Sequence, residues 1–264
     1  MQQLAPEEIK SCCAAAYEEP AVRWLLGGEL HPGGVDATRR ALQLIMLGRG
    51  ERLLDVASGA GESALLAARE FGASVTGVDY GEQAVLGAIQ SARSERLDTS
   101  VRFARGDAED LALADDSFDA ALCECSLCTF PDKERAVTEM ARVLRPGARV
   151  AISDVVVDAD RLPAELLGPM ATIACVGSAL SRPGYEELLA SAGLEVYAVE
   201  SRDADTERFA ERIEERLRGA RLLGLDRFIG SPFSLDEAIE LARMARHSIE
   251  EGAIGYAIFA AASR

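Results

Sequence analysis

The stretch LLDVASGAGE, residues 53–62, joins a short apolar segment to a glycine turn, which an alanine-rich helix over residues 62–71 is expected to follow. Glycine has no Cβ, so a Gly-x-Gly turn between a strand and a helix lets the backbone approach a ligand closely. Residues 59–64 also have the spacing of the dinucleotide fingerprint, and Asp79 lies roughly twenty residues further on, where a ribose-binding acid is expected. The stretch therefore predicts an α/β fold that binds a nucleotide.

Apolar segments of strand length alternate with helical patterns along most of the chain. This alternation predicts parallel strands that are joined by right-handed helical crossovers. We expect a seven-stranded, mostly parallel sheet with helices on both faces. The expected strands are residues 52–57, 74–78, 101–104, 118–123, 149–155, 194–200 and 255–261.

The pattern divides the chain into four parts. Residues 1–47 are predicted to form an N-terminal helical lid segment, broken by glycine-rich turns. Residues 48–202 hold the first six strands, and residues 253–264 hold the last one. The part between them, 203–252, is predicted to be a helical insertion, since its SLDE stretch has the capping-box pattern that begins a helix. We expect the insertion to pack over the binding site.

The composition argues against several classes of protein. The formal net charge of −16 disfavours a nucleic-acid partner, because such proteins normally present a basic surface to phosphate. A membrane span would need about eighteen consecutive apolar residues, and none is found. The chain also lacks a secretory signal pattern, so a cytoplasmic protein with six reduced cysteines is expected. The sequence does not indicate an oligomeric state.

Further motifs separate this chain from the dinucleotide-binding enzymes. Asp55 lies inside the first expected strand, where those enzymes usually have an apolar residue. GDA at residues 106–108 follows the third strand, FDAA at 118–121 leads into the fourth, and VLRPGA at 143–148 precedes the fifth. Over residues 51–154 this order and spacing resemble the Rossmann-like class I S-adenosylmethionine-dependent methyltransferases, of the methyltransferase type 11 or UbiE-like kind.

The resemblance implies a site for S-adenosylmethionine, whose product is S-adenosylhomocysteine. It implies that the glycine turn lines the methionine part, with Asp55 near the ammonium group, Asp79 on the ribose hydroxyls and Asp107 on the adenine. The alternative for each acid is a turn or helix cap. Ala57 and Ser58 stand where many relatives have glycine and cysteine. The expected cofactor-binding residues are Asp55, Ala57, Gly59, Gly61, Asp79, Tyr80, Asp107, Ala108 and Cys123.

The acceptor site is less well defined by the sequence. A hydroxyl acceptor usually needs a base, and His31 is a candidate because amino-terminal segments commonly close over the site in this fold. The alternative is that His31 only fixes its own loop. The Asn-Pro-Pro-Tyr pattern of amino-nitrogen methylation is absent after the fourth strand, which reads CECS at residues 123–126. We find no acidic ligand set of the catechol type, so no resident metal is expected.

The cysteines point to a more specific acceptor. ACVGSAL at residues 174–180 resembles a stretch of the arsenite methyltransferases that contains a metalloid-binding cysteine, here Cys175. Soft thiolates suit a soft metalloid, and Cys125 is a second candidate, while the pair at residues 12–13 resembles that family's amino-terminal pair. However, Ala64 stands at the family's cysteine after the glycine turn, and no cysteine follows Cys175. The alternative is that the cysteines are small buried hydrophobic residues.

Methyl transfer to a small-molecule acceptor is the leading functional hypothesis. Carbon, oxygen and sulfur acceptors stay open, and arsenite methylation by cysteine thiolates is the alternative acceptor chemistry. Two other functions also stay open, namely a non-catalytic module that binds S-adenosylmethionine and a nicotinamide-dependent oxidoreductase.

Overall fold

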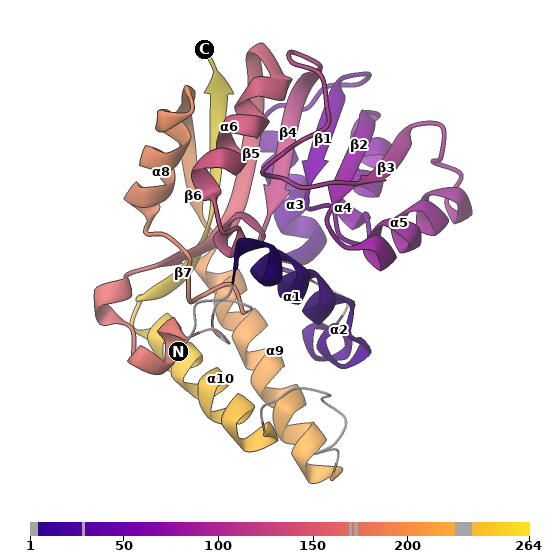
Figure 1. Ribbon diagram of the computed structural model, residues 1–264. Coiled ribbons are helices and arrows are strands. Elements are labelled where there is room, and N and C mark those ends of the chain that lie inside the picture. Colours follow the sequence, from indigo (N-terminus) through magenta and orange to yellow (C-terminus); the bar gives the residue numbers. More distant parts are fainter. Residues whose placement is uncertain (1–4, 28–29, 169–170, 172–173, 225–233) are drawn as a thin grey trace.

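The structure is a computed structural model that describes residues 5–27, 30–168, 171, 174–224 and 234–264. These residues form a layered α/β core with additional helices at one end (Figure 1). Residues 225–233 of the expected helical insertion lie outside the described part. None of the described helices is both long enough and apolar enough to cross a membrane.

A seven-stranded sheet with the order β3-β2-β1-β4-β5-β7-β6 forms the centre of the molecule (Figure 1). Strands β1 to β5 pair in parallel, whereas β7 pairs antiparallel with both β5 and β6. The predicted Rossmann-like, mostly parallel sheet is therefore confirmed. The strands are β1 Arg52–Val56, β2 Ser74–Asp79, β3 Val101–Arg105, β4 Phe118–Glu124, β5 Leu144–Val157, β6 Leu194–Ser201 and β7 Ile254–Ser263.

The central strands are apolar because both faces of the sheet are covered. Parallel strands buried in this way read as nearly continuous hydrophobic runs, and in β4 Ala120, Ala121 and Leu122 are fully buried. Strand β5 is longer than expected because Leu144 already pairs with Phe118. A register shift follows this pair, so the sheet accommodates the expected Pro-Gly turn inside the strand.

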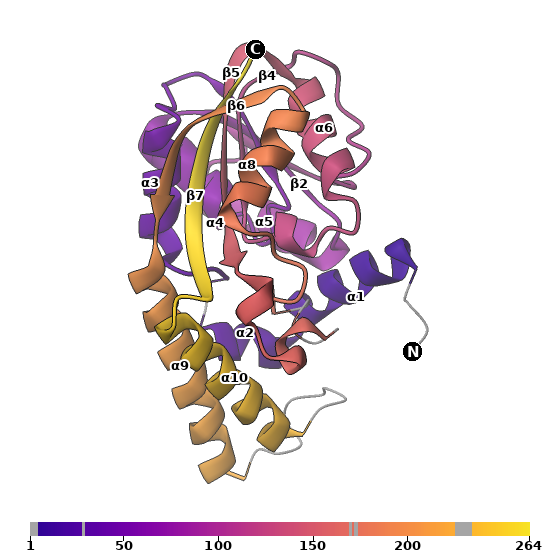
Figure 2. The same ribbon diagram turned by 90° about the vertical axis from the view of Figure 1, so that its left-hand side faces the viewer.

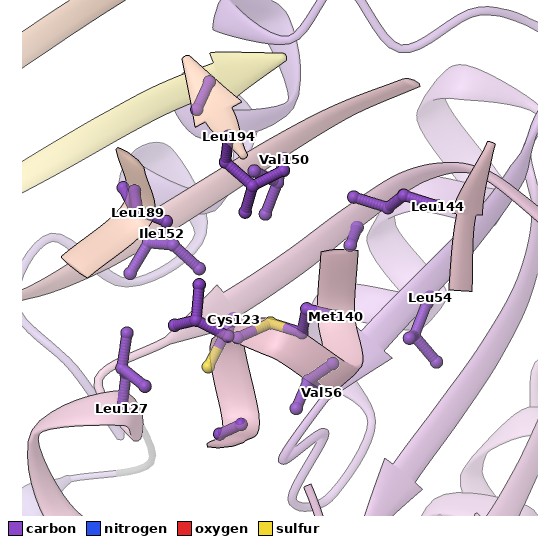
Figure 3. Packing of buried hydrophobic residues seen from close by; sticks show 14 of the residues in the cluster. Leu54, Val56, Cys123, Leu127, Met140, Leu144, Val150, Ile152, Leu189 and Leu194 are labelled. Atoms are coloured by element: carbon purple, nitrogen blue, oxygen red, sulfur yellow. The ribbon is translucent and has the colours of Figure 1, made fainter. Parts of the chain in front are cut away.

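Helices pack on both faces of the sheet (Figure 2). On one face lie α3 Gly34–Leu44, α4 Glu62–Leu66 and α5 Glu82–Ser94, and on the other lie α6 Lys133–Val143 and α8 Arg182–Ser191. Figure 3 shows the core under α6 and α8, where Met140 and Leu189 contact the apolar strand side chains. The helix expected over residues 62–71 is α-helical only as far as α4 and continues as a π-helix over Ala67–Phe71.

The remaining helices lie at the end of the sheet where the parallel strands finish (Figures 1 and 2). They are α1 Pro6–Glu18, α2 Pro20–Leu26, α9 Asp203–Leu222 and α10 Leu235–Glu250. Leu217 of α9 packs against Leu235 and Ile239 of α10. The capping box expected at the start of α10 is present, since Ser234 Oγ accepts a hydrogen bond from the Glu237 amide.

Candidate cofactor and acceptor site

A cavity of about 240 Å³ opens at the carboxyl ends of β1, β2 and β4, with α1 on its far side. Ligands of open α/β sheets bind outside these strand ends. The predicted site residues that line the cavity are His31, Asp55, Ala57, Gly59, Asp79, Tyr80, Asp107, Ala108 and Cys125. Three other predicted residues that the structure describes, Gly61, Cys123 and Cys175, are not part of the lining.

The turn between β1 and α4 presents backbone to the cavity. Ala57 and Gly59 have φ angles of 57° and 51°, a left-handed conformation that glycine adopts freely but that strains alanine. A Cβ at Gly59 would meet Leu30 at 3.5 Å, which is an ordinary contact, so the space beside it belongs to the cavity. A Cβ at Gly61 would instead lie 2.5 Å from Phe103 Cζ. Gly61 therefore allows α4 to pack close to β3.

Asp79 ends β2 and connects two turns beside the cavity. Its Oδ2 accepts a hydrogen bond from the Gly59 amide at 2.7 Å, and its Oδ1 accepts one from the Gly81 amide at 2.8 Å. Burial raises the pKa of Asp79, and these two amide bonds partly offset the rise. The carboxylate is therefore fixed in orientation and keeps lone pairs for ligand hydroxyls.

Asp107 follows β3 and pairs with a cation that the sequence did not single out. Lys10 Nζ of α1 lies 2.7 Å from Asp107 Oδ2 and 2.6 Å from Glu109 Oε2. Burial alone would lower the pKa of Lys10, but the hydrogen bonds to these two carboxylates outweigh it and raise that pKa. An adenine amino group bound at Asp107 would therefore share the carboxylate with Lys10.

Two carboxyl groups lie close together beneath the glycine turn. Asp55 is 2% exposed, and its Oδ2 has no hydrogen-bond partner among the described residues. Burial raises the pKa of Asp55 well above its usual range, and the charges of Glu124 and Asp79 raise it further. Glu124, at the end of β4, accepts hydrogen bonds from Ser63 at 2.6 Å and Thr38 at 3.0 Å. Glu124 was not among the predicted site residues, although an acid at the end of a buried strand could have indicated it.

His31 lines the cavity with a side chain that is 12% exposed. Its Nδ1 lies 3.3 Å from the Pro32 carbonyl, and its Nε2 lies 3.5 Å from Thr38 Oγ1 and 3.8 Å from Glu124 Oε2. Both ring nitrogens therefore face groups of the protein. This arrangement fits the alternative in which His31 fixes its own loop, and its role as a base stays a prediction.

Three cysteine thiols gather next to the cavity. The thiols of Cys125, Cys128 and Cys175 hydrogen-bond to one another, and Tyr17 Oη of α1 lies 3.2 Å from Cys175 Sγ. The hydrogen bonds from Cys125 and Cys128 lower the pKa of the Cys175 thiol. Cys125 reaches the cavity, whereas the side chain of Cys123 is fully buried in the core beside α6 (Figure 3). A cofactor contact at Cys123 would therefore involve its backbone.

Acidic side chains outnumber permanently charged basic ones around the cavity. A cleft lined mainly by one sign of charge attracts a ligand of the opposite sign, so this cavity suits a cationic ligand. The acidic lining residues are Glu18, Asp55, Glu62, Asp79, Asp107, Glu109 and Glu124, and the basic ones are Lys10 and Arg23.

Comparison with known proteins identifies the family. A family model described as a methyltransferase domain matches residues 47–193, which is more than half of the chain. The chain belongs to the class I methyltransferases. The resemblance seen in the sequence is therefore confirmed, and the cofactor of this family is S-adenosylmethionine.

Three curated relatives of this methyltransferase cover different shares of it. Methyltransferase GfsG from Streptomyces halstedii is 34% identical over 169 residues, or 63% of this chain and 61% of GfsG. An arsenite methyltransferase from Halobacterium salinarum is 33% identical over 176 residues, or 66% of this chain and 45% of the relative. The 27-O-demethylrifamycin SV methyltransferase from Amycolatopsis mediterranei is 32% identical over 228 residues, which are 85% of this chain and 81% of that enzyme. The chain thus spans less than two thirds of the first two relatives.

Solved structures share the fold of this methyltransferase. The [4+2]-cyclase SpnF gives a TM-score of 0.73 at 24% identity, covering 100% of this chain and 98% of SpnF. Geranyl diphosphate C-methyltransferase from Streptomyces coelicolor was solved with Mg²⁺, geranyl diphosphate and S-adenosylhomocysteine. It gives a TM-score of 0.75 at 18% identity, and the match covers 97% of this chain and 98% of that enzyme. At these identities the likeness shows the fold alone.

The residues of the cavity fit S-adenosylmethionine chemically. The unpartnered, buried Oδ2 of Asp55 needs a hydrogen-bond donor, and the ammonium group of the cofactor is one. The fixed carboxylate of Asp79 suits ribose hydroxyls. The acidic lining also suits the positive sulfonium.

Proposed function

We propose that this methyltransferase transfers a methyl group from S-adenosylmethionine to a small-molecule acceptor. The observation that supports this most is one acidic cavity at the strand ends where the glycine turn, Asp79 and Asp107 meet. Two of the similar proteins are named for or solved with small molecules, a rifamycin and geranyl diphosphate. A cytoplasmic location and the lack of a nucleic-acid partner rest on composition and stay predictions.

The chain contributes to the reaction mainly by positioning. When bound, S-adenosylmethionine supplies a methyl group on a positively charged sulfur. Asp79 would hold the ribose hydroxyls of the bound cofactor, and Asp107 would hold its adenine amino group. Cys125 and Tyr17, which line the same cavity, would border the acceptor. Fixed geometry and the exclusion of water supply much of the rate of such a displacement.

The helices at the strand ends close the site in this proposal. The lid segment, residues 1–47, contributes Lys10 and Tyr17, while the core of residues 48–202 and the last strand, 253–264, hold the cofactor. The insertion, residues 203–252, supports the lid from behind. In support of this role, the guanidinium of Arg216 in α9 lies 5.8 Å from the ring centre of Trp24 in α2.

Binding and turnover measurements test the proposal. Isothermal titration should show binding of S-adenosylmethionine and S-adenosylhomocysteine but not of NAD. Release of S-adenosylhomocysteine with a panel of hydroxyl, thiol and carbon acceptors would establish the reaction. Preferred binding of NAD would instead support an oxidoreductase, and cofactor binding without turnover of any acceptor would support a binding module.

A variant of Asp79 tests the cofactor site itself. Asp79→Ala should weaken binding by roughly 1–3 kcal/mol, because it leaves ribose hydroxyls without a partner. Asp98→Ala, which changes an exposed acid in a turn remote from the cavity lining, is the matched control and should bind as the wild type does. Equal affinities for both variants would contradict the assignment of Asp79.

The contact among the three thiols supports a second candidate, a trivalent metalloid such as arsenite as the acceptor. Cys175 is the cysteine to which the resemblance points, and Cys125 extends the thiol group to the cavity. Among the residues that the structure describes, no three His, Cys, Asp or Glu side chains are arranged to hold a metal ion. A metalloid would therefore have to draw the thiols closer together.

Arsenite-dependent release of S-adenosylhomocysteine tests this candidate. Turnover should occur in the wild type, disappear in Cys175→Ser and persist in Cys12→Ser, since Cys12 is exposed on α1. Methylation of another acceptor that is equally fast in the wild type and in Cys175→Ser would remove the metalloid candidate and leave the main proposal intact.

A further inference from the structure

We propose that Glu124 is the anionic partner of the cofactor's ammonium group, and that Asp55 stays neutral beside it. The inference rests on the proposed function, because it concerns the same cofactor site. It moves to Glu124 a role that the family resemblance implied for Asp55.

Hydroxyl groups surround Glu124 and stabilise its charged form. The side chain is 5% exposed. Its Oε2 accepts hydrogen bonds from Ser63 at 2.6 Å and Thr38 at 3.0 Å, and its Oε1 accepts one from Ser153 at 3.2 Å. Tyr256 donates to Ser153 at 3.0 Å, which directs the serine hydrogen toward Glu124. Hydrogen bonds donated to a carboxylate favour its ionised state.

Asp55 lies in a poorer environment for a negative charge. The Ala64 amide bonds to its carboxyl group, but Oδ2 has no partner in the described part of the chain, and the residue is 2% exposed. Burial raises the pKa of Asp55, and the nearby charge of Glu124 raises it further. Two neighbouring carboxyl groups resist carrying charge together. The three hydroxyl donors therefore favour the negative charge on Glu124, and the buried position with an unpartnered oxygen disfavours a charge on Asp55.

The carboxyl groups of Glu124 and Asp55 together form a site that suits a cationic hydrogen-bond donor. Both line the cavity, at the side of the glycine turn. Lys10, the cation that α1 contributes to the cavity lining, is already paired with Asp107 and Glu109. An ammonium group has several N–H donors, so it can meet the charge of Glu124 and the unpartnered Oδ2 of Asp55 at once. The unpartnered buried oxygen is an independent sign that a ligand atom belongs at this position.

Titration with two ligands separates a contact to the ammonium from a contact to the adenosine. S-adenosylhomocysteine has the amino-acid group, whereas 5′-methylthioadenosine keeps the adenosine and thioether but lacks it. In Glu124→Gln we expect S-adenosylhomocysteine to bind about tenfold or more weakly, because a charge-assisted hydrogen bond becomes a neutral one. Affinity for 5′-methylthioadenosine should stay within about twofold of the wild type.

Two further variants sharpen the assignment. Glu124→Asp keeps the charge and should regain part of the lost affinity for S-adenosylhomocysteine. Asp55→Asn removes no charge and keeps a carbonyl oxygen as acceptor, so it should cost less of that affinity than Glu124→Gln does. A large loss in Asp55→Asn together with an unchanged Glu124→Gln would overturn the inference, as would an equal loss of both ligands in Glu124→Gln.

Thermal melting shows whether each variant folds. If Glu124→Gln does not fold, Ser153→Ala removes one donor to the same carboxylate and should weaken S-adenosylhomocysteine selectively, and a loss shared by both ligands would overturn the inference. A wild type that binds neither S-adenosylmethionine nor S-adenosylhomocysteine defeats the proposed function itself. A wild type that binds both, with an insensitive Glu124→Gln, defeats only the role of Glu124.

Discussion

Gly61 shows how one residue of a binding motif can act through packing. Its φ is 85°, and a Cβ there would lie 2.5 Å from Phe103 Cζ and 3.0 Å from the methyl group of Ala88. We expect Gly61→Ala to lower the free energy of unfolding by roughly 1–3 kcal/mol, through overpacking and backbone strain. Urea unfolding measures this change.

Gly87 of α5 is the matched control for that substitution. A Cβ added there would meet no described atom within 4 Å, so Gly87→Ala should raise stability by about 0.5–1 kcal/mol through helix propensity. If Gly61→Ala kept the wild-type stability and instead lost cofactor affinity, Gly61 would contact the ligand directly.

The residues that the sequence analysis predicted are those that belong to local motifs. Asp79 and Asp107 each follow a strand and lie at the cavity as expected. Lys10 could not be predicted, because its partner Asp107 is 97 positions away. Alternation along a strand would put Cys123 and Cys125 on one face, but Cys125 lies beyond β4 with a φ of 48°. The period of two ends with the strand, so only Cys125 turns to the cavity.

Helix α1 is held over the cavity mainly by polar contacts. It contains no buried residue. Lys10 pairs with Asp107 and Glu109, and Glu18 accepts hydrogen bonds from two amides at the start of α5. In Lys10→Met we expect the amides of α1 to exchange about tenfold faster, because local opening loses roughly 1–2 kcal/mol of charge-assisted bonding.

Hydrogen exchange followed by mass spectrometry measures this prediction. Arg93→Met removes an exposed cation from α5 and is the matched control, with exchange in α1 unchanged. Wild-type protection of α1 in Lys10→Met would mean that the other contacts of the helix, such as those of Glu18 and Tyr17, hold it without Lys10.

Some element boundaries depend on neighbouring residues and others on residues far apart in the sequence. The capping box of α10 is predictable because Ser234 and Glu237 are three positions apart and bond to each other. The early start of β5 depends on the pairing of Leu144 with Phe118, which are far apart in the sequence. The sequence around residue 146 shows only the turn-forming residues, so the longer strand could not be read from it.

At the scale of the whole molecule, the alternation of strands and helices predicts the sheet but not the order of its last strands. The segment of β7 is buried over eight consecutive residues, Ile254 to Ala261, as expected for an interior strand. The β6 segment, Leu194–Ser201, is largely exposed or half-buried and forms the edge. Burial of this kind follows from packing against helices on both faces, which single-sequence periodicity does not reveal.

Buried acids and the net charge of the molecule both make its stability depend on pH. Burial and then the charge of Cys175 raise the pKa of Asp154 to about 7, from a usual value of 3.8. An acid with a higher pKa in the folded chain binds its proton more tightly there, so its stabilising effect is lost as pH rises through about 7. Burial raises the pKa values of Asp55 and Asp79 as well, and these act in the same direction.

We therefore expect the free energy of unfolding to fall between about pH 4 and pH 7, the range between the usual and the folded pKa of Asp154. Below that range the opposite effect sets in, because hydrogen bonds from Arg142 lower the pKa of Glu139, and its contribution is lost on acidification. The net charge of −16 adds self-repulsion at high pH, which salt screens. Urea unfolding at several pH values and two salt concentrations separates the two effects. In Asp154→Asn, the loss of unfolding free energy with rising pH that remains at high salt should be smaller by roughly 1–4 kcal/mol. A pH profile parallel to that of the wild type would contradict the role of Asp154.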